Sequence, residues 1–195
     1  MRTKVIGSLL VLAICVGVAP AVSETVIPVV SSSQKLGQKP GKFDQNNLFD
    51  LLTSATNESR GREIENEIWR NWMVAPNDQI QELLKQALEA RRWYDFEKAR
   101  KLLNQIVEQA PEYAEGWNQR AFILFLQEKF DDALSDAEKA LELEPRHFGA
   151  MAGQAQILMR QGRFSTAQKI LKKAVKIHPY LRERSMIIKT QEQDL

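Results

Sequence analysis

Few residues in this chain of 195 are of the types that catalyse reactions or bind metals. It contains two histidines, His147 and His178, and one cysteine, Cys15. Neither histidine has a Cys, Asp or Glu at the spacing of a metal site. No nucleophile elbow, phosphate loop or zinc-protease motif occurs. Gly149 and Gly153 fall inside one expected helix, where they favour close packing over phosphate binding. We therefore expect no enzymatic activity, no cofactor and no metal.

The N-terminal segment has the layout of a secretory signal peptide, assigned to residues 1–23. Two basic residues precede an apolar run at 5–18, and small residues follow. The run is shorter than the roughly 20 residues of a membrane-spanning helix. Cleavage fits equally after Ala21 and after Ser23, and an uncleaved anchor is the alternative. We expect export to the periplasm of a Gram-negative bacterium, with no membrane span after signal removal.

A linker and then a helical region follow the signal peptide. Residues 24–45 are rich in Ser, Val, Gln, Lys, Gly and Pro without a helical period, which indicates a flexible linker. From residue 46 on, Gly and Pro are rare and apolar residues recur every three or four positions, as in amphipathic helices. Removing the two cations of the signal balances the charge of the mature chain, so charge gives no argument for nucleic acid as a partner.

The region after residue 80 repeats itself with a period of 34 residues. Each copy has an apolar helix with a small Ala, a turn, a Phe that opens a second helix with another small Ala, and a Pro that ends it. The matching positions are Ala87, Ala121 and Ala155; Phe96, Phe130 and Phe164; Ala99, Ala133 and Ala167; and Pro111, Pro145 and Pro179.

These columns resemble the tetratricopeptide repeat (TPR) family, and the middle copy, with Trp117, Ala121, Ala133 and Pro145, matches best. Other stretches look like small exported TPR proteins of alphaproteobacteria. The resemblance implies an all-α fold, an α-α superhelix of about three helix pairs. A degenerate helix pair would precede them as an earlier repeat, and a capping helix would follow them. The expected segments are the degenerate pair at 46–79, the repeats at 80–113, 114–147 and 148–181 (together 80–181), and the capping helix and tail at 182–195.

The resemblance also implies a concave groove formed by the first helix of each pair. At the matching positions apolar residues are unusually frequent, with arginines at the edge. The expected groove residues are Leu84, Leu88, Arg92, Asn118, Phe122, Phe125, Leu126, Gln156, Met159 and Arg160. The resemblance thus implies a protein–protein interaction module that binds a peptide or protein partner of unknown identity. The competing interpretation is that neighbouring helices cover this face.

Charge is segregated along the repeats. Residues 112–145 are strongly acidic and residues 146–195 strongly basic. This pattern is consistent with a solvated outer face, with self-association through the acidic and basic faces, or with docking on an anionic surface. The alternative function is therefore a structural or scaffold component of a cell-envelope assembly that docks through its basic C-terminal repeat.

Overall fold

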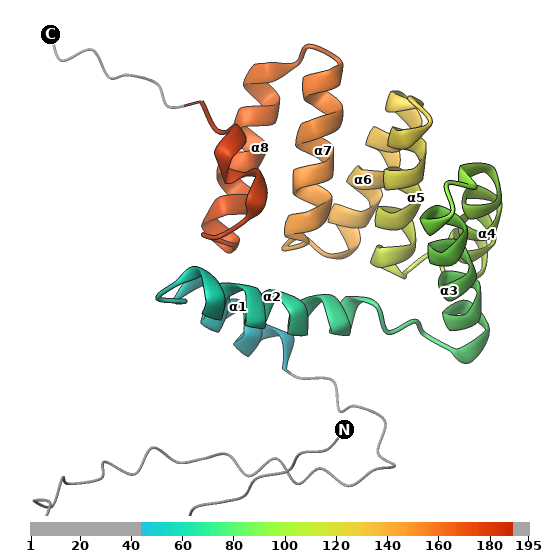
Figure 1. Cartoon of the computed structure of the whole chain (residues 1–195), viewed down its shortest axis with the longest axis horizontal. Helices are drawn as coiled ribbons and strands as arrows, with labels where there is room; N and C mark the ends of the chain where they lie inside the picture. Colours follow the sequence, from blue (N-terminus) through green and yellow to red (C-terminus); the bar gives the residue numbers. More distant parts are fainter. Residues whose placement is uncertain (1–43, 189–195) are drawn as a thin grey trace, which may run out of the picture. The chain divides into compact units, whose positions relative to one another are not determined.

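The computed structural model describes residues 44–188, which form eight α-helices, one short 3-10 helix (η1) and no strand (Figure 1). The predicted signal peptide, nearly all of the predicted linker and residues 189–195 lie outside this described part. The predicted all-α fold of helix pairs is confirmed. The elements are α1 (Gln45–Thr53), α2 (Glu58–Trp72), α3 (Asp78–Arg92), α4 (Phe96–Gln109), α5 (Ala114–Leu126), α6 (Phe130–Leu143), α7 (Phe148–Arg160), α8 (Phe164–Ile177) and η1 (Arg182–Met186).

The three repeats are the helix pairs α3–α4, α5–α6 and α7–α8, and each pair packs on the next through α4 with α5 and α6 with α7. The alanine columns explain the packing. Ala99, Ala133 and Ala167 are all 0% exposed. A methyl group at these positions lets two helix backbones approach closely, whereas a larger side chain would hold them apart.

The helix ends follow from local chemistry. Phe96 and its two counterparts are the first residues of α4, α6 and α8, as predicted. Pro111 and its counterparts stand two positions after a helix end, because proline cannot continue the hydrogen-bonding pattern. At the start of α3, Asn77 accepts a hydrogen bond from the Ile80 amide at 2.9 Å, and Asp95 caps α4 through the Lys98 amide at 3.0 Å.

The predicted N-terminal helix pair is present as α1 and α2, but it does not extend the stack ahead of the first repeat. Its apolar side chains share a core with the third repeat, including Leu181, the residue before η1. This corrects the expected packing of residues 46–79. The shared core consists of Leu48, Phe49, Leu52, Ile64, Ile68, Trp72, Phe148, Ala152, Ala174 and Leu181.

Helix α2 instead crosses the turns between successive repeats (Figure 1). At its C-terminal end, the Tyr113 hydroxyl donates to the Trp72 carbonyl at 2.9 Å. The Trp72 ring stacks on His147, with ring centroids 3.8 Å apart and planes 13° from parallel. At the other end, Gly61 lies against Tyr180. Aromatic contacts with the turns therefore position α2. These contacts explain why α2 packs across the turns and not ahead of the first repeat.

The C-terminal cap is shorter than the helix expected at 182–195, because only η1 is helical among the described residues of that segment. Gln168 of α8 donates to the Met186 carbonyl at 2.9 Å and accepts from the Ile188 amide at 2.8 Å. These bonds hold the chain extended beside α8. Leu181 is 4% exposed and Ile187 packs on the third repeat, so the cap still covers it. No helix within residues 44–188 is long and apolar enough to cross a bilayer.

Candidate functional site

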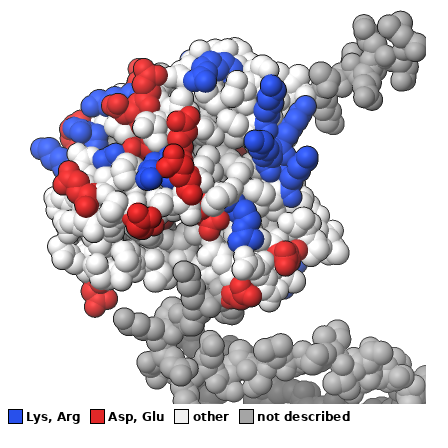
Figure 2. Space-filling view, turned by 180° about the vertical axis from the view of Figure 1, so that it is seen from behind, with Lys and Arg blue, Asp and Glu red and all other residues white. Residues whose placement is uncertain are grey.

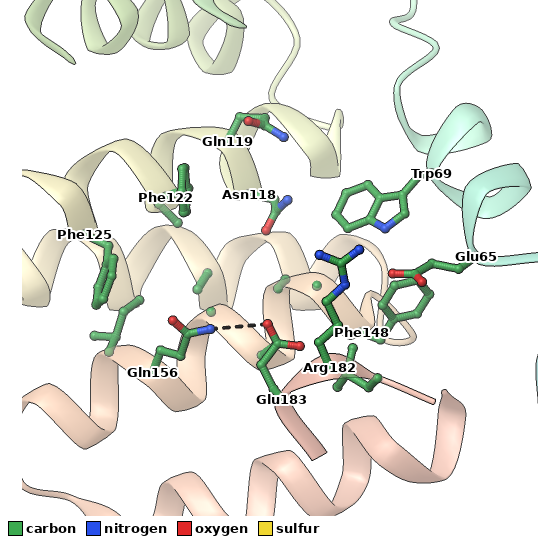
Figure 3. Close-up of a pocket in the computed structure, with 18 of the residues that line it drawn as sticks. Glu65, Trp69, Asn118, Gln119, Phe122, Phe125, Phe148, Gln156, Arg182 and Glu183 are labelled. Carbon is green, nitrogen blue, oxygen red and sulfur yellow. Dashed lines mark hydrogen bonds between the residues drawn. The ribbon is translucent and has the colours of Figure 1, made fainter. Parts of the chain in front are cut away.

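An open cavity of about 320 Å³ lies between the repeats and α2, lined mainly by residues of α2, α5, α7 and η1, with one residue each from α3 and α6 (Figure 3). This volume is at the lower end of the range of ligand pockets, about 300–1,000 Å³. Aromatic rings project into it from two sides. The apolar lining consists of Trp69, Ala121, Phe122, Phe125, Ala137, Phe148, Ala150, Ala152, Ile157 and Leu181.

Two glycines of α7 shape this cavity in different ways. A Cβ atom at Gly149 would lie 2.7 Å from Cη2 of Trp69, so the missing side chain lets the indole approach α7. A Cβ atom at Gly153 would have no neighbour within 4 Å, because this residue borders open space. The close packing expected at both glycines is therefore found at Gly149, whereas Gly153 leaves the cavity wide.

A buried polar network runs beneath the cavity from α3 to α7. Arg91 Nη1 donates to Gln119 Oε1 at 2.6 Å, and Gln119 Nε2 donates to Glu115 Oε1. His147 Nδ1 accepts from the Ala150 amide at 3.1 Å, so Nε2 carries the proton and donates to Glu115 Oε2 at 2.9 Å. Because the network joins all three repeats, it holds the amide of Gln119 and the guanidinium of Arg91 in place at the cavity wall.

The Arg91 guanidinium is the half-buried cation of this wall. It lies over the Phe122 ring, 5.4 Å from the centroid. Burial lowers the pKa of Arg91 from its ordinary value, although the nearby Glu115 carboxylate acts in the opposite direction. The arginine remains charged, and the aromatic face partly replaces the water it loses.

The opposite edge of the cavity comes from α7 and η1. Gln156 Nε2 donates to Glu183 Oε1 at 3.5 Å, and Figure 3 shows the Arg182 side chain extending toward Trp69 and Glu65. The site therefore presents an apolar floor with amide, carboxylate and guanidinium groups along its edge. Such a surface is suited to a peptide, which offers side chains to the floor and backbone groups to the edge.

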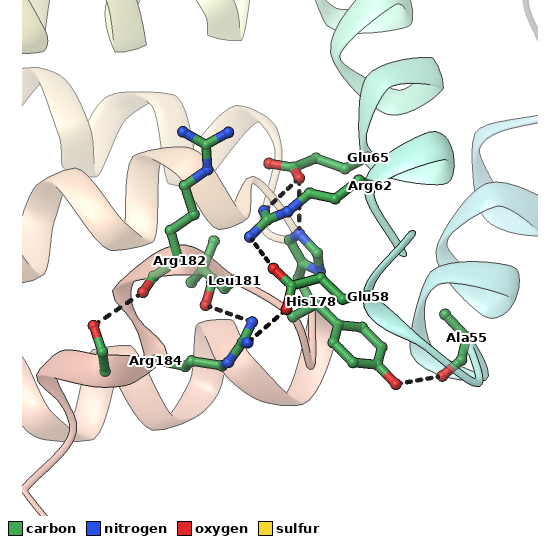
Figure 4. Close-up of polar contacts among 10 residues, drawn as sticks. Ala55, Glu58, Arg62, Glu65, His178, Leu181, Arg182 and Arg184 are labelled. Atoms are coloured by element: carbon green, nitrogen blue, oxygen red, sulfur yellow. Dashed lines mark hydrogen bonds and ion pairs between the residues drawn. The ribbon is translucent and has the colours of Figure 1, made fainter. Parts of the chain in front are cut away.

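Charged contacts within α2 and from α2 to His178 and η1 hold the N-terminal half of α2 in place (Figure 4). Arg62 donates to Glu58 at 3.1 Å and to Glu65 at 2.7 Å, and Arg184 donates to Glu58 at 2.9 Å. His178 Nε2 lies 3.3 Å from Glu65 Oε2. Burial alone would raise the pKa of Glu65, but the contacts with His178 and Arg62 lower it to about 2.

The two histidines that sequence spacing left without acidic neighbours both contact a glutamate from a distant element. His147 meets Glu115, and His178 meets Glu65. Both imidazoles are 0% exposed, so they are positioned inside the fold and cannot reach a ligand in solution. Within residues 44–188 no group of three or more His, Cys, Asp or Glu could hold a metal ion.

Four of the ten groove residues expected from the sequence line the cavity: Asn118, Phe122, Phe125 and Gln156. The others lie elsewhere. Leu84 is 0% exposed and belongs to the core of the first repeat, which corrects its assignment to an open groove. Leu88 and Met159 are half-buried against core clusters, while Leu126, Arg92 and Arg160 are exposed outside the cavity.

The sequence did not indicate the part of the site that comes from outside the repeats. Trp69 and Glu65 come from α2, and Arg182 and Glu183 come from η1. Within the repeats, Phe148 was also missed. The available signal was Gly149, because a glycine inside a helix of good helix formers indicates a close approach by another group.

Three stacked antiparallel helix pairs with a cavity along one side define a helical-repeat protein, a class that works by binding other molecules. The tetratricopeptide repeat family matches residues 124–180. A TPR repeat-containing protein of Rhizobium etli is 29% identical over 160 residues, covering 82% of this chain and 78% of the relative. With the fold, these matches support a protein of the tetratricopeptide repeat family.

Solved structures agree with this fold. The TPR2B domain of yeast Sti1, in its pHsp70 complex, superposes with a TM-score of 0.54 at 23% identity, covering 57% of this chain and 91% of that chain. YrrB, a TPR protein with an unusual peptide-binding site, gives a TM-score of 0.50 at 18% identity and covers 63% of this chain and 61% of its own. At these identities the likeness concerns the fold alone. The family and the fold are typical of interaction modules rather than enzymes.

Proposed function

We propose that this protein is an exported interaction module that binds a peptide or protein partner in the cavity beside α5 and α7. The observation that carries the proposal is the exposed apolar floor of that cavity. Phe122 is 45% exposed, and the partly exposed rings of Trp69 and Phe125 line the same hollow, whereas Phe148 beneath them is buried. A soluble fold gains nothing from presenting several aromatic rings to water, so such a concave surface marks a binding site.

The polar groups at the cavity edge indicate which kinds of peptide the site would bind. Asn118 and Gln156 offer amide groups to a peptide backbone, and Arg91 offers a guanidinium beside the Phe122 ring. An apolar side chain followed or preceded by an acidic one would satisfy both the floor and the arginine. The Sti1 domain and YrrB, which share the fold, are themselves described as bound to pHsp70 and as having a peptide-binding site, and these descriptions support a peptide as the class of ligand.

A substitution that fills the cavity tests this proposal. Peptides are selected from a displayed random library on the immobilised full-length protein, and their dissociation constants are measured by fluorescence anisotropy. Gly153→Leu places a side chain in the open space that surrounds this residue, so it should weaken peptide binding at least tenfold while the thermal midpoint stays near that of the wild type.

Two variants serve as controls. Gly153→Ala adds one methyl group and should leave binding nearly unchanged. Phe164→Ala removes a ring that is 57% exposed on the outer helix α8, far from the cavity lining, and should also bind normally. If the selected peptides bind Gly153→Leu as tightly as the wild type, the binding site lies elsewhere and the proposed groove is refuted.

Export is the second part of the proposal and rests on the layout of residues 1–23. The intact mass of the protein recovered from the periplasm of an expressing Gram-negative host should lack residues 1–21 or 1–23. Recovery of the full-length chain in the cytoplasmic fraction would contradict it.

A further inference from the structure

The outer face of α8 carries a row of lysines, here called the lysine stripe: Lys169, Lys172, Lys173 and Lys176. Their spacing places all four on one side of the helix, and all four are exposed. Figure 2 shows basic side chains gathered at the right of the view, the side on which α8 lies, with few acidic ones among them. The stripe therefore forms a continuous positive strip along the end of the array.

Several other described helices pair a cation with an acidic residue one turn away, and α8 has no such pair. Arg60 pairs with Glu63 at 2.9 Å and Lys139 with Glu142 at 3.0 Å, each one turn apart on the same helix. Helix α8 contains no Asp or Glu, and no lysine of the stripe forms an ion pair with another residue of the described part. Like charges one turn apart repel and destabilise a helix, so a partner with negative charge would relieve a cost built into α8.

Exposed apolar side chains border the stripe. Phe164, the first residue of α8, is 57% exposed, and Ile188 is 62% exposed. Gln168 lies one turn after Phe164 on the same side of the helix, and its hydrogen bond to the Ile188 amide at 2.8 Å holds Ile188 nearby. The next residue inward, Ile187, packs into the third repeat, which turns Ile188 outward. Charge and apolar surface thus lie side by side.

We propose that the lysine stripe, with Phe164 and Ile188, seats this protein on the surface of an anionic phospholipid bilayer. The ammonium groups would lie at the level of the lipid phosphates, and the two apolar side chains would enter the headgroup boundary. Long flexible lysines are suited to a diffuse negative field, whereas a specific acidic protein is more often held by arginines in fixed bidentate pairs. The inference is independent of the cavity and of its peptide ligand.

The test measures binding of the full-length protein to vesicles by flotation. One set of vesicles contains phosphatidylglycerol and phosphatidylcholine, and the other contains phosphatidylcholine alone, which reports any binding through uncharged parts of the chain. Each lysine near an anionic surface strengthens binding about fivefold at low salt. The variant K172Q/K176Q should therefore bind anionic vesicles about 25-fold more weakly than the wild type.

The matched control is K98Q/K101Q, which removes two exposed lysines from the second helix of the first repeat. The control should bind anionic vesicles like the wild type. The variant F164A should bind anionic vesicles severalfold more weakly than the wild type, with the same dependence of binding on salt concentration. Three results would overturn the proposal: no preference for anionic over neutral vesicles, equal losses in the two lysine variants, or concentration-dependent dimers that K172Q/K176Q abolishes in the absence of vesicle binding. The last result would assign the stripe to a second copy of the chain.

Discussion

The position of α2 can be tested with two alanine substitutions one turn apart on α7. Gly149→Ala would place its Cβ atom 2.7 Å from Cη2 and 2.8 Å from Cζ2 of Trp69, distances that require the indole or the helix to move. Gly153→Ala would place its Cβ atom in open space. The two substitutions make the same chemical change in the same helix, so their difference reports the contact with α2.

The two substitutions should change the free energy of unfolding in opposite directions. Replacing a helical glycine by alanine stabilises a helix by about 0.5–1 kcal/mol, because the unfolded chain loses freedom. Gly153→Ala should gain about that amount. At Gly149 the gain is opposed by the overpacking cost, about 1–3 kcal/mol, and the net effect should be destabilising. The thermal midpoints of the two variants should therefore differ by several degrees, at about 2–4 °C per kcal/mol.

Urea unfolding followed by far-ultraviolet circular dichroism and by tryptophan fluorescence measures both effects. A background of Trp69→Ala provides the control, since without the indole the penalty at Gly149 should vanish and the two alanine variants should become equivalent. The reasoning is refuted if Gly149→Ala is as stable as Gly153→Ala in the presence of Trp69, because α2 would then not pack on α7 as the structure has it.

Three further predictions concern pH, the cavity and the core. Because its basic partners outweigh burial and lower the pKa of Glu65 to about 2, the ionised carboxylate stabilises the fold above the unfolded pKa of about 4.3, and this stability is lost as pH falls toward 2. Urea unfolding should show the wild type losing roughly 1–2 kcal/mol more than Glu65→Gln between pH 5 and 2.5, and parallel losses would contradict this. Phe122→Ala should cost about 1–2 kcal/mol because the ring is 45% exposed, whereas Phe148→Ala, at 1% exposed, should cost about 3–5 kcal/mol; similar melting temperatures would mean that Phe122 is covered in solution. Ala155→Glu should destabilise the array by about 3–5 kcal/mol at pH 7, and less below pH 4, because it places an unpaired carboxylate at a 0% exposed site; an unchanged midpoint would refute the repeat register.

The repeats could be predicted from the sequence because their determinants are local and periodic. A column such as Ala99, Ala133 and Ala167 requires small residues wherever two helices touch, and each copy repeats the requirement. The half of the cavity formed by α5 and α7 was indicated by the family resemblance that these columns carry, through Asn118 and Gln156.

The other half depends on contacts between distant segments. An amphipathic pattern shows that Ile64, Ile68 and Trp72 share one face of α2, but it does not show which surface that face will meet. The turn before α7 and the start of α7 offer a better match than the first repeat does, because the ring of His147 stacks on Trp72 and Gly149 leaves room for Trp69. Neither residue belongs to a repeating column, so periodicity could not indicate the contact.

The contact of α2 with the turns also ties the cavity to the stability of the array. Trp69 both packs against Gly149 and lines the hollow beside Phe122. The residues of α2 that touch the repeats span about 16 Å of helix, from Gly61 near Tyr180 to Trp72. Because α2 contacts the repeats at both of its ends, it restrains how far successive repeats can rotate relative to one another. That rotation sets the width of a superhelical groove. Loosening α2 by Gly149→Ala should therefore weaken peptide binding more than its effect on stability alone would explain, whereas Gly153→Leu blocks binding with α2 still in place.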